Sequence, residues 1–186
     1  IQTDFSLQAL NEVKPQKISF EEIDFNLGER WIDSGIYSEY ISNLFKTPVE
    51  IQYNKTLDDF QLKCEAPNTI VNEKYAVKTS SQTMNGVALL HHALVNSTPN
   101  ITKKIMVNGE EATIRDPEAI QLANTIIDEI RNGFIDWLRN KPEAFQSQIE
   151  EKYNTTFNCF LRPEFDGSFQ NFPDLELQNI GIDQLY

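Results

Sequence analysis

The side chains in this sequence that are best suited to chemistry are its carboxylates, several of which are adjacent to each other. Such pairs occur at Glu21-Glu22, Asp58-Asp59, Glu110-Glu111 and Glu150-Glu151. Two carboxylates can act as general acid and general base, but only where they are held beside a reacting group. The sequence ties none of these pairs to a nucleophile or a base, and adjacent acids in an acidic chain are typical of solvated faces. We therefore expect no catalytic residue and no independent enzyme activity.

Two histidines and two cysteines are the remaining candidates for metal or redox chemistry. His91 and His92 are neighbours on a predicted helix, where adjacent side chains point about 100° apart and share a metal poorly. We expect one of them to be half-buried and hydrogen-bonded, the other to be exposed, and no metal site. Cys64 and Cys159 lie far apart without CxxC or histidine spacing, which favours reduced thiols, buried as small hydrophobic side chains, in a cytoplasmic protein.

Motifs that bind nucleotide cofactors are absent from the sequence. It contains no GK dipeptide, and hence no phosphate-binding GxxxxGK[ST] loop, no PP dipeptide, and hence no NPPY-type methylase motif, and no GxG. We therefore expect no cofactor.

The segment from Tyr153 to Pro173 has the composition of a docking surface. It reads YNTTFNCFLRPEFDGSFQNFP, and each of its large aromatic side chains can bury roughly 150–250 Å². These aromatic residues are Tyr153, Phe157, Phe160, Phe165, Phe169 and Phe172.

Within this segment, Asp166-Gly167-Ser168 is typical of a turn, because Gly167 is free to take positive φ. We expect the turn to direct Phe165 and Phe169 at one hydrophobic surface. An alternative is that Arg162 and Asp166 are polar contacts to nucleotide or DNA.

Three ordered motifs in the chain resemble one known family. The first is LGxxWI, formed by Leu27, Gly28, Trp31 and Ile32, and the second is FIDWL at residues 134–138. The third runs YN, two residues, FN, then R, an aromatic and DGS, with these members: Tyr153, Asn154, Phe157, Asn158, Arg162, Phe165, Asp166, Gly167, Ser168 and Pro173. Together they are similar, over about residues 19 to 186, to large phage and mobile-element polypeptides that fuse an adenine-specific DNA methylase to a superfamily 2, SNF2-like helicase.

The resemblance implies an accessory domain that precedes the helicase and is excised from a larger polypeptide. Its partners would be the methylase and helicase modules, and Leu185-Tyr186 looks like the point where the helicase begins. Phe169 departs from the family pattern, which usually has His after DGS. We expect residues 1–17 to be a lead-in segment and residues 18–186 to form a single domain. The residues expected to contact the partner modules are Trp31, Arg162, Phe165, Asp166, Gly167, Ser168 and Phe169.

The net charge of −12 argues against autonomous nucleic-acid binding, because Lys and Arg supply most of that affinity by releasing counterions from phosphate. A local basic patch remains an alternative. Its candidate DNA contacts are Lys103, Lys104, Arg131 and Arg139, with Arg115, Lys141 and Arg162 nearby in sequence. These cations favour DNA contact if they gather on one face and a coupling role if they are scattered among acids. No apolar run approaches the length of about 18 residues that a transmembrane helix requires, so no membrane partner is expected.

Elements in the first half of the chain can be placed from apolar periodicity and end signals. A helix is predicted from Asp33 or Ser34, as N-cap, to Lys46, where Pro48 prevents its continuation. Period-two alternation predicts strands at 49–53 and 60–64, paired as a hairpin, with a third strand at 75–77 in the same small sheet. Asn85-Gly86 introduces a short buried helix over 87–95.

The second half contains the strongest signals. Asn108-Gly109 is typical of a type I′ turn and predicts a protruding β-hairpin over 104–114. Asp116-Pro117 predicts the start of a long helix that ends near Arg139 and forms the core's spine, and a further helix starts at Glu143. A short helix is expected near 7–13. The predicted fold class is α+β, with Trp31 and Trp137 substantially buried.

Two functions follow from these observations. The first is a non-catalytic coupling domain that packs between the methylase and helicase modules of a cytoplasmic DNA-processing polypeptide. The alternative is an accessory domain that contacts DNA through the hairpin and the cations near the long helix and guides it into the helicase.

Overall fold

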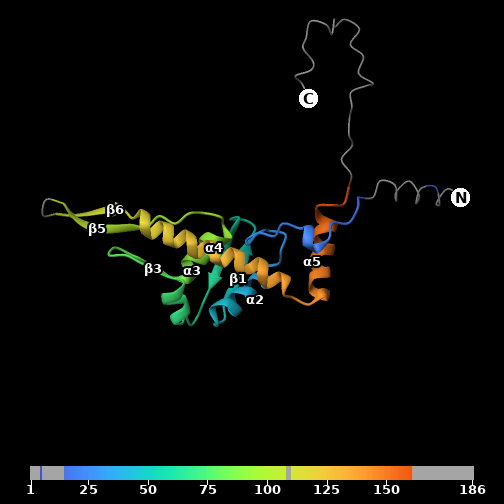
Figure 1. The fold of residues 1–186 in the computed structure, drawn as a ribbon, viewed down its shortest axis with the longest axis horizontal. Coiled ribbons are helices and arrows are strands. Elements are labelled where there is room, and N and C mark those ends of the chain that lie inside the picture. The colour runs from blue at the N-terminus through green and yellow to red at the C-terminus, as the bar shows by residue number, and fades with distance from the viewer. Residues whose placement is uncertain (1–4, 6–14, 108–109, 161–186) are drawn as a thin grey trace, which may run out of the picture.

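Helix α4 (Pro117–Arg139) is the central element of the fold (Figure 1). The structure is a computed structural model that describes residue 5, residues 15–107 and residues 110–160 of the 186-residue chain. As predicted, Asp116 is the N-cap and its side chain accepts a hydrogen bond from the Ala119 amide, with Pro117 in the first turn. At 1.5 Å per residue, the helix is about 35 Å long. Its buried stripe consists of Ile120, Ala123, Ile126, Ile127, Ile130, Phe134 and Leu138.

Helix α2 (Ser34–Phe45) packs on α4 through aromatic side chains. The Tyr37 and Tyr40 rings lie 5.3 and 5.4 Å from the Phe134 ring, centroid to centroid. The Tyr40 hydroxyl donates a 2.7 Å hydrogen bond to the Ile130 carbonyl, so the buried phenol is satisfied. The predicted N-cap, Asp33, accepts from the Gly35 amide, and the helix ends at Lys46, which has a φ of 54°.

Three separate two-stranded antiparallel ladders complete the β structure. The first joins β1 (Glu50–Asn54) to β2 (Asp59–Lys63), the second joins β3 (Val77–Lys78) to β4 (Thr83–Met84), and the third joins β5 (Thr102–Val107) to β6 (Glu110–Arg115). Each pair of strands is close in sequence, and no two ladders share a strand within the described part of the chain.

The prediction that a third strand joins the first hairpin was wrong. That strand, β3, pairs with β4 instead. The outer edge of β1 is already occupied by α2, because the Ser42 and Ser38 hydroxyls accept hydrogen bonds from the Val49 and Ile51 amides. A backbone edge whose donors are satisfied in this way has no need of a further strand.

Helix α3 (Gly86–Leu94) follows Asn85, which is its N-cap, and Leu89, Leu90 and Ala93 bury it against α4. The π-helical turn η2 (Ile70–Lys74) and the 3₁₀ turn η1 (Phe20–Glu22) were not predicted from the sequence. Periodicity is too weak a signal in segments of three to five residues.

The two ends of α4 carry different structures (Figure 1). The β5–β6 hairpin projects beyond its N-terminal end, and Val107 pairs with Glu110 across the predicted turn, whose residues Asn108 and Gly109 lie outside the described part. Helix α5 (Glu143–Thr156) crosses its C-terminal end and buries Ile149. These features confirm the α+β class with a long central helix. Trp31 and Trp137 are both partly buried against the core, as expected.

Among the helices of the described residues, none combines the length and the apolar character needed to span a bilayer.

Candidate interaction site

The loop from Phe25 to Trp31, which contains the LGxxWI motif, is anchored on the end of α3. Gly28 has a φ of +93°, and a Cβ atom at this position would lie 1.9 Å from the carbonyl oxygen of Leu94. Only glycine allows the backbone to approach this closely with that conformation. Leu27 beside it is buried in the core. The glycine of the motif therefore has a structural role that fixes the loop against α3.

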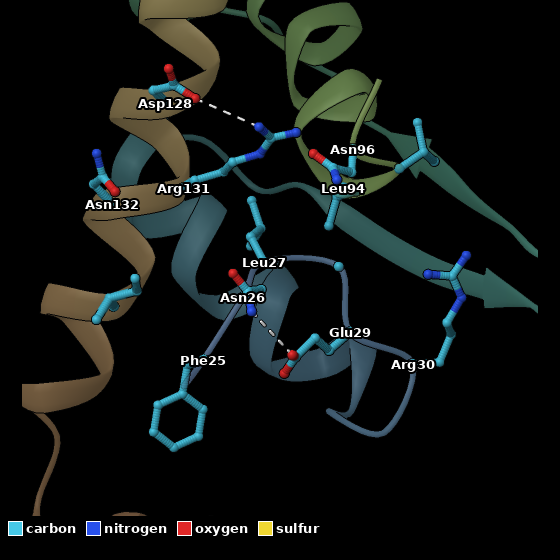
Figure 2. A pocket seen from close by; sticks show the side chains of 13 residues that line it. Phe25, Asn26, Leu27, Glu29, Arg30, Leu94, Asn96, Asp128, Arg131 and Asn132 are labelled. Carbon is cyan, nitrogen blue, oxygen red and sulfur yellow. Dashed lines mark hydrogen bonds and ion pairs between the residues drawn. The ribbon is translucent and has the colours of Figure 1, made fainter. Parts of the chain in front are cut away.

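Arg131 joins the same region to α4 (Figure 2). Its Nε donates to the Ala93 carbonyl at 3.2 Å and its Nη2 to the His92 carbonyl at 3.3 Å, while Nη1 lies 3.6 Å from the Asp128 carboxylate. The guanidinium thus satisfies carbonyls of the last turn of α3, which have no partner within that helix. A pocket of about 570 Å³ lies beside Arg131, and the side-chain amides of Asn26, Asn96 and Asn132 line it.

The 25–31 loop also carries Trp31 into an aromatic cluster, made up of Phe20, Phe25, Trp31, Tyr153 and Phe157. The Trp31 ring lies 5.5 Å from the Tyr153 ring and 5.9 Å from the Phe157 ring, in edge-to-face geometry. Phe25 contacts both Trp31 and Phe20, with centroid distances of 6.2 and 4.8 Å. The Trp31 indole N–H donates to the Glu29 carboxylate at 2.8 Å, which fixes the ring's orientation.

One edge of the aromatic cluster is open to solvent. Phe157 is 51% exposed and Phe160, just beyond it, is 61% exposed, whereas Phe20 and Phe25 behind them are buried. Large apolar side chains on a surface, backed by a packed aromatic layer, are typical of protein interaction sites. The cluster therefore offers a rigid apolar face at the C-terminal end of α5.

Two asparagines of the YNxxFN motif hold residues 16–18, which form no regular secondary structure, against the end of α5. The Asn154 amide accepts from the Ile18 N–H at 2.9 Å and donates to the Ile18 carbonyl at 2.8 Å. Asn158 donates to the Gln16 carbonyl and to Asn154 Oδ1. Asn154 is buried, so its amide replaces the strand partner that the 16–18 backbone would otherwise need.

The candidate DNA contacts do not converge on one face. Lys103 lies 3.3 Å from Asp116, and Lys104 lies 3.0 Å from Glu111. Both are at the hairpin end of α4, whereas Arg139 is exposed at the opposite end, about 35 Å away along the helix axis. Arg131 lies between them and is engaged with α3 and Asp128. Three of the four cations are thus paired with acids, and the four are scattered along the length of α4. This is the arrangement that favours a coupling role over DNA contact.

Both histidines are partly buried and hydrogen-bonded, so the prediction of one exposed histidine was wrong. His91 Nε2 lies 2.9 Å from Asp59 Oδ1, and His92 Nδ1 lies 2.8 Å from the Ser97 hydroxyl. Residues Asn96 and Ser97 fold back over the end of α3 and give His92 a partner that helical periodicity does not reveal. Burial, and then the proximity of His91, lower the pKa of His92 below its usual value. Over the described ranges, no group of three or more His, Cys, Asp or Glu side chains is arranged to hold a metal ion.

The expectation of two buried cysteines was also incorrect for one of them. Cys64 is half-buried, but Cys159 is exposed, because it lies beyond the last turn of α5.

Of the predicted interaction residues, the structure places Trp31 in the aromatic cluster. The others, Arg162, Phe165, Asp166, Gly167, Ser168 and Phe169, lie outside the described residues. Sequence reasoning gave no role to Glu29, the partner of the Trp31 indole, or to Asn154 and Asn158. The i, i+4 spacing of the two asparagines, which places Asn158 just beyond the end of α5 and in contact with Asn154, was the signal available.

Comparison with known proteins identifies one family for this chain. No curated protein and no solved structure matches this chain. Residues 26–159 match the family described as "Domain of unknown function (DUF8437)", and because this range covers more than half of the 186 residues, the chain belongs to that family.

Proposed function

We propose that this chain is a non-catalytic coupling domain of a cytoplasmic DNA methylase–helicase polypeptide, which packs between the methylase and helicase modules. The observation that carries the proposal is the aromatic cluster, in which Phe157 packs edge-to-face against the partly buried Trp31 and is itself 51% exposed to solvent. Such a face is suited to protein contact, because aromatic side chains contribute much of the binding energy of interfaces.

The positions of the motifs support this proposal. Trp31 comes from LGxxWI, and Tyr153 and Phe157 come from YNxxFN, yet the three rings are in mutual contact. Phe134 and Trp137 of the FIDWL motif lie in the core and pack against Tyr40. The aromatic residues of these motifs within the described part of the chain thus contribute to one site and to the core that supports it.

The rigidity of the face is a second support. The Trp31 indole is oriented by Glu29, and α5 is tied to the 16–18 segment by Asn154. A side chain that is already ordered before binding loses less conformational entropy on association, so preorganisation favours affinity.

DNA contact, the alternative function, has weaker support. Lys103, Lys104 and Arg131 each have an acidic partner, and the net charge of −12 repels phosphate. Arg139 is the remaining candidate within the described residues, and a single exposed cation contributes little affinity.

The test uses the full methylase–helicase polypeptide and compares Phe157→Ala with Leu122→Ala. Leu122 is 52% exposed on α4, so it is a matched control for loss of an exposed apolar side chain. We expect Phe157→Ala to reduce DNA-stimulated ATP hydrolysis several-fold, with the melting temperature of the domain nearly unchanged, and Leu122→Ala to change neither quantity. Equal ATPase rates for Phe157→Ala and the unsubstituted polypeptide would overturn the proposal. An Arg139→Ala variant that loses DNA affinity would favour the alternative.

A further inference from the structure

The β5–β6 hairpin has one edge that is closed and one that is open. On β5, the Lys104 amide donates to the Ser80 hydroxyl at 2.9 Å, and the Thr102 carbonyl accepts from the Thr79 hydroxyl at 2.7 Å. These outward-pointing groups on β5 are therefore satisfied by the 79–81 segment. Strand β6 pairs with β5 alone, and within the described residues no further strand covers its other edge.

The register shows which residues form the open edge. Thr102 and Lys104, whose backbone groups point away from β6, are paired with Arg115 and Thr113. In an antiparallel ladder, directly opposed residues of this kind both point their N–H and C=O groups outward. The open edge of β6 therefore presents the backbone of Glu111, Thr113 and Arg115. Unpaired edges of this type accept an added strand.

We infer that this edge pairs with the same edge of a second copy of the chain. In an antiparallel arrangement with Thr113 opposite the partner's Thr113, Glu111 lies opposite the partner's Arg115. By two-fold symmetry, Arg115 lies opposite the partner's Glu111, so both ion pairs form at once. An isologous contact of this kind closes as a dimer and joins two hairpins into one four-stranded sheet.

The side chains on both faces fit this register. On the face of the sheet that carries the Thr113 side chain, Glu111 of one copy lies opposite Arg115 of the other. Opposite charges directly across a strand pair stabilise the pairing. Lys104 forms its ion pair with Oε2 of Glu111. Within the described residues, Oε1 of Glu111 has no hydrogen-bond partner, so it is available to Arg115 of the second copy. On the other face, Ala112 lies opposite the partner's Ile114. Val107 and Ile114, which are 45% and 39% exposed in one copy, then belong to a larger apolar surface.

The pairing is limited to residues 111–115. The next opposed pair would be Glu110 and the partner's Asp116, which are both acidic, and each copy carries a net charge of −12. The contact area is therefore small and the association weak, in the range typical of transient interfaces. This inference goes beyond the proposed coupling role, because it concerns the opposite end of α4 from the aromatic cluster (Figure 1).

Sedimentation velocity on the full 186-residue chain tests the inference, over concentrations from about 10 µM to about 1 mM, where weak association is measured. We expect a monomer–dimer equilibrium. Glu111→Arg or Arg115→Glu alone should weaken the dimer at least about tenfold, because each places like charges opposite each other twice. An equimolar mixture of the two variants should restore association, since both mixed pairs then have opposite charges.

The backbone contribution is tested separately with Thr113→Pro, which removes an outward N–H without removing a bond to β5. It should abolish the dimer, whereas Thr113→Ala should retain it. Thermal melts of each variant verify that the hairpin is intact. A wild-type chain that stays monomeric throughout, or a mixture of charge variants that associates no better than either alone, would contradict the inference.

Discussion

The side-chain amide of Asn154 forms two hydrogen bonds with the backbone of Ile18, a residue 136 positions earlier in the sequence. The amide takes the place of a neighbouring β-strand for this short extended segment. Its position on α5 therefore ties the beginning of the described fold to its last helix, directly beneath the aromatic cluster.

Loss of this amide should be costly. Asn154→Ala leaves the partly buried N–H and C=O groups of Ile18 without this partner, and an unsatisfied group that is fully buried costs about 1–3 kcal/mol. We expect the free energy of unfolding to fall by roughly 2–4 kcal/mol, measured by urea denaturation. Thr155→Ala is the control, because the Thr155 hydroxyl is exposed and bonds only to carbonyls of its own helix. Equal stability of the two variants would show that the Ile18 contact contributes nothing.

Gly28→Ala should destabilise the domain more than a typical glycine substitution. The new Cβ would meet the Leu94 carbonyl oxygen, and the positive φ adds about 1–2 kcal/mol. We expect a loss of at least about 2 kcal/mol in unfolding free energy. The control is Asn96, which lines the same pocket and has a φ of 53°. Because glycine adopts positive φ without strain, Asn96→Gly should change the free energy of unfolding by less than about 1 kcal/mol. A Gly28→Ala variant as stable as wild type would refute the close approach.

Asp58 should make stability depend on pH in the acidic range. Its hydrogen bonds from Arg30, and then from Tyr53, lower the pKa of Asp58 from 3.8 to about 2. A depressed pKa in the folded state means that the ionised form stabilises the fold above 3.8, and that this contribution is lost as the pH falls from 3.8 towards 2. Asn also tolerates the φ of 50° at this position, so Asp58→Asn is a suitable variant.

The expected result for Asp58→Asn is a melting temperature below that of wild type near neutral pH, with the difference shrinking as the pH approaches about 2. Lys55→Gln, in the same connection between β1 and β2, controls for general effects on that turn. A difference between Asp58→Asn and wild type that stays constant from neutral to acidic pH would rule out this origin.

Substitution of Arg131 should lower stability, whereas substitution of Arg139 should hardly change it, although both were candidate DNA contacts. Arg131→Ala removes the donors that satisfy the last carbonyls of α3 and should cost about 1–3 kcal/mol of unfolding free energy. Arg139→Ala, at an exposed position, should change stability by less than about 0.5 kcal/mol. Neither change should alter the affinity of the isolated domain for duplex DNA, measured by fluorescence anisotropy at fixed salt. A clear drop in affinity for Arg139→Ala would restore the DNA-contact function.

Local signals in the sequence were sufficient for helices α2 to α5 and for the β1–β2 and β5–β6 hairpins, whereas the helix expected near 7–13 lies outside the described residues. Asp33 and Asp116 serve as predicted N-caps, because capping depends on residues within one turn. The partner of β3 was not predictable in this way, since it depends on two serines of α2 that close the edge of β1.

The candidate site was predictable only in part, for a related reason. Trp31 was identified from its motif, but its contacts with Tyr153 and Phe157 bring together residues that no local pattern connects. The role of Gly28 likewise depends on the end of a helix more than sixty residues away, at Leu94.

Asp116 joins the hairpin to the long helix with almost no freedom between them. Its amide donates to the Ile101 carbonyl, and Oδ1 of its carboxylate accepts from both the Ala119 amide and Lys103 Nζ, so one residue bonds to both β5 and α4. The hairpin and α4 are consequently joined without a flexible linker. Because Asp116 alone separates β6 from α4, the direction in which the hairpin projects is set by the axis of the long helix.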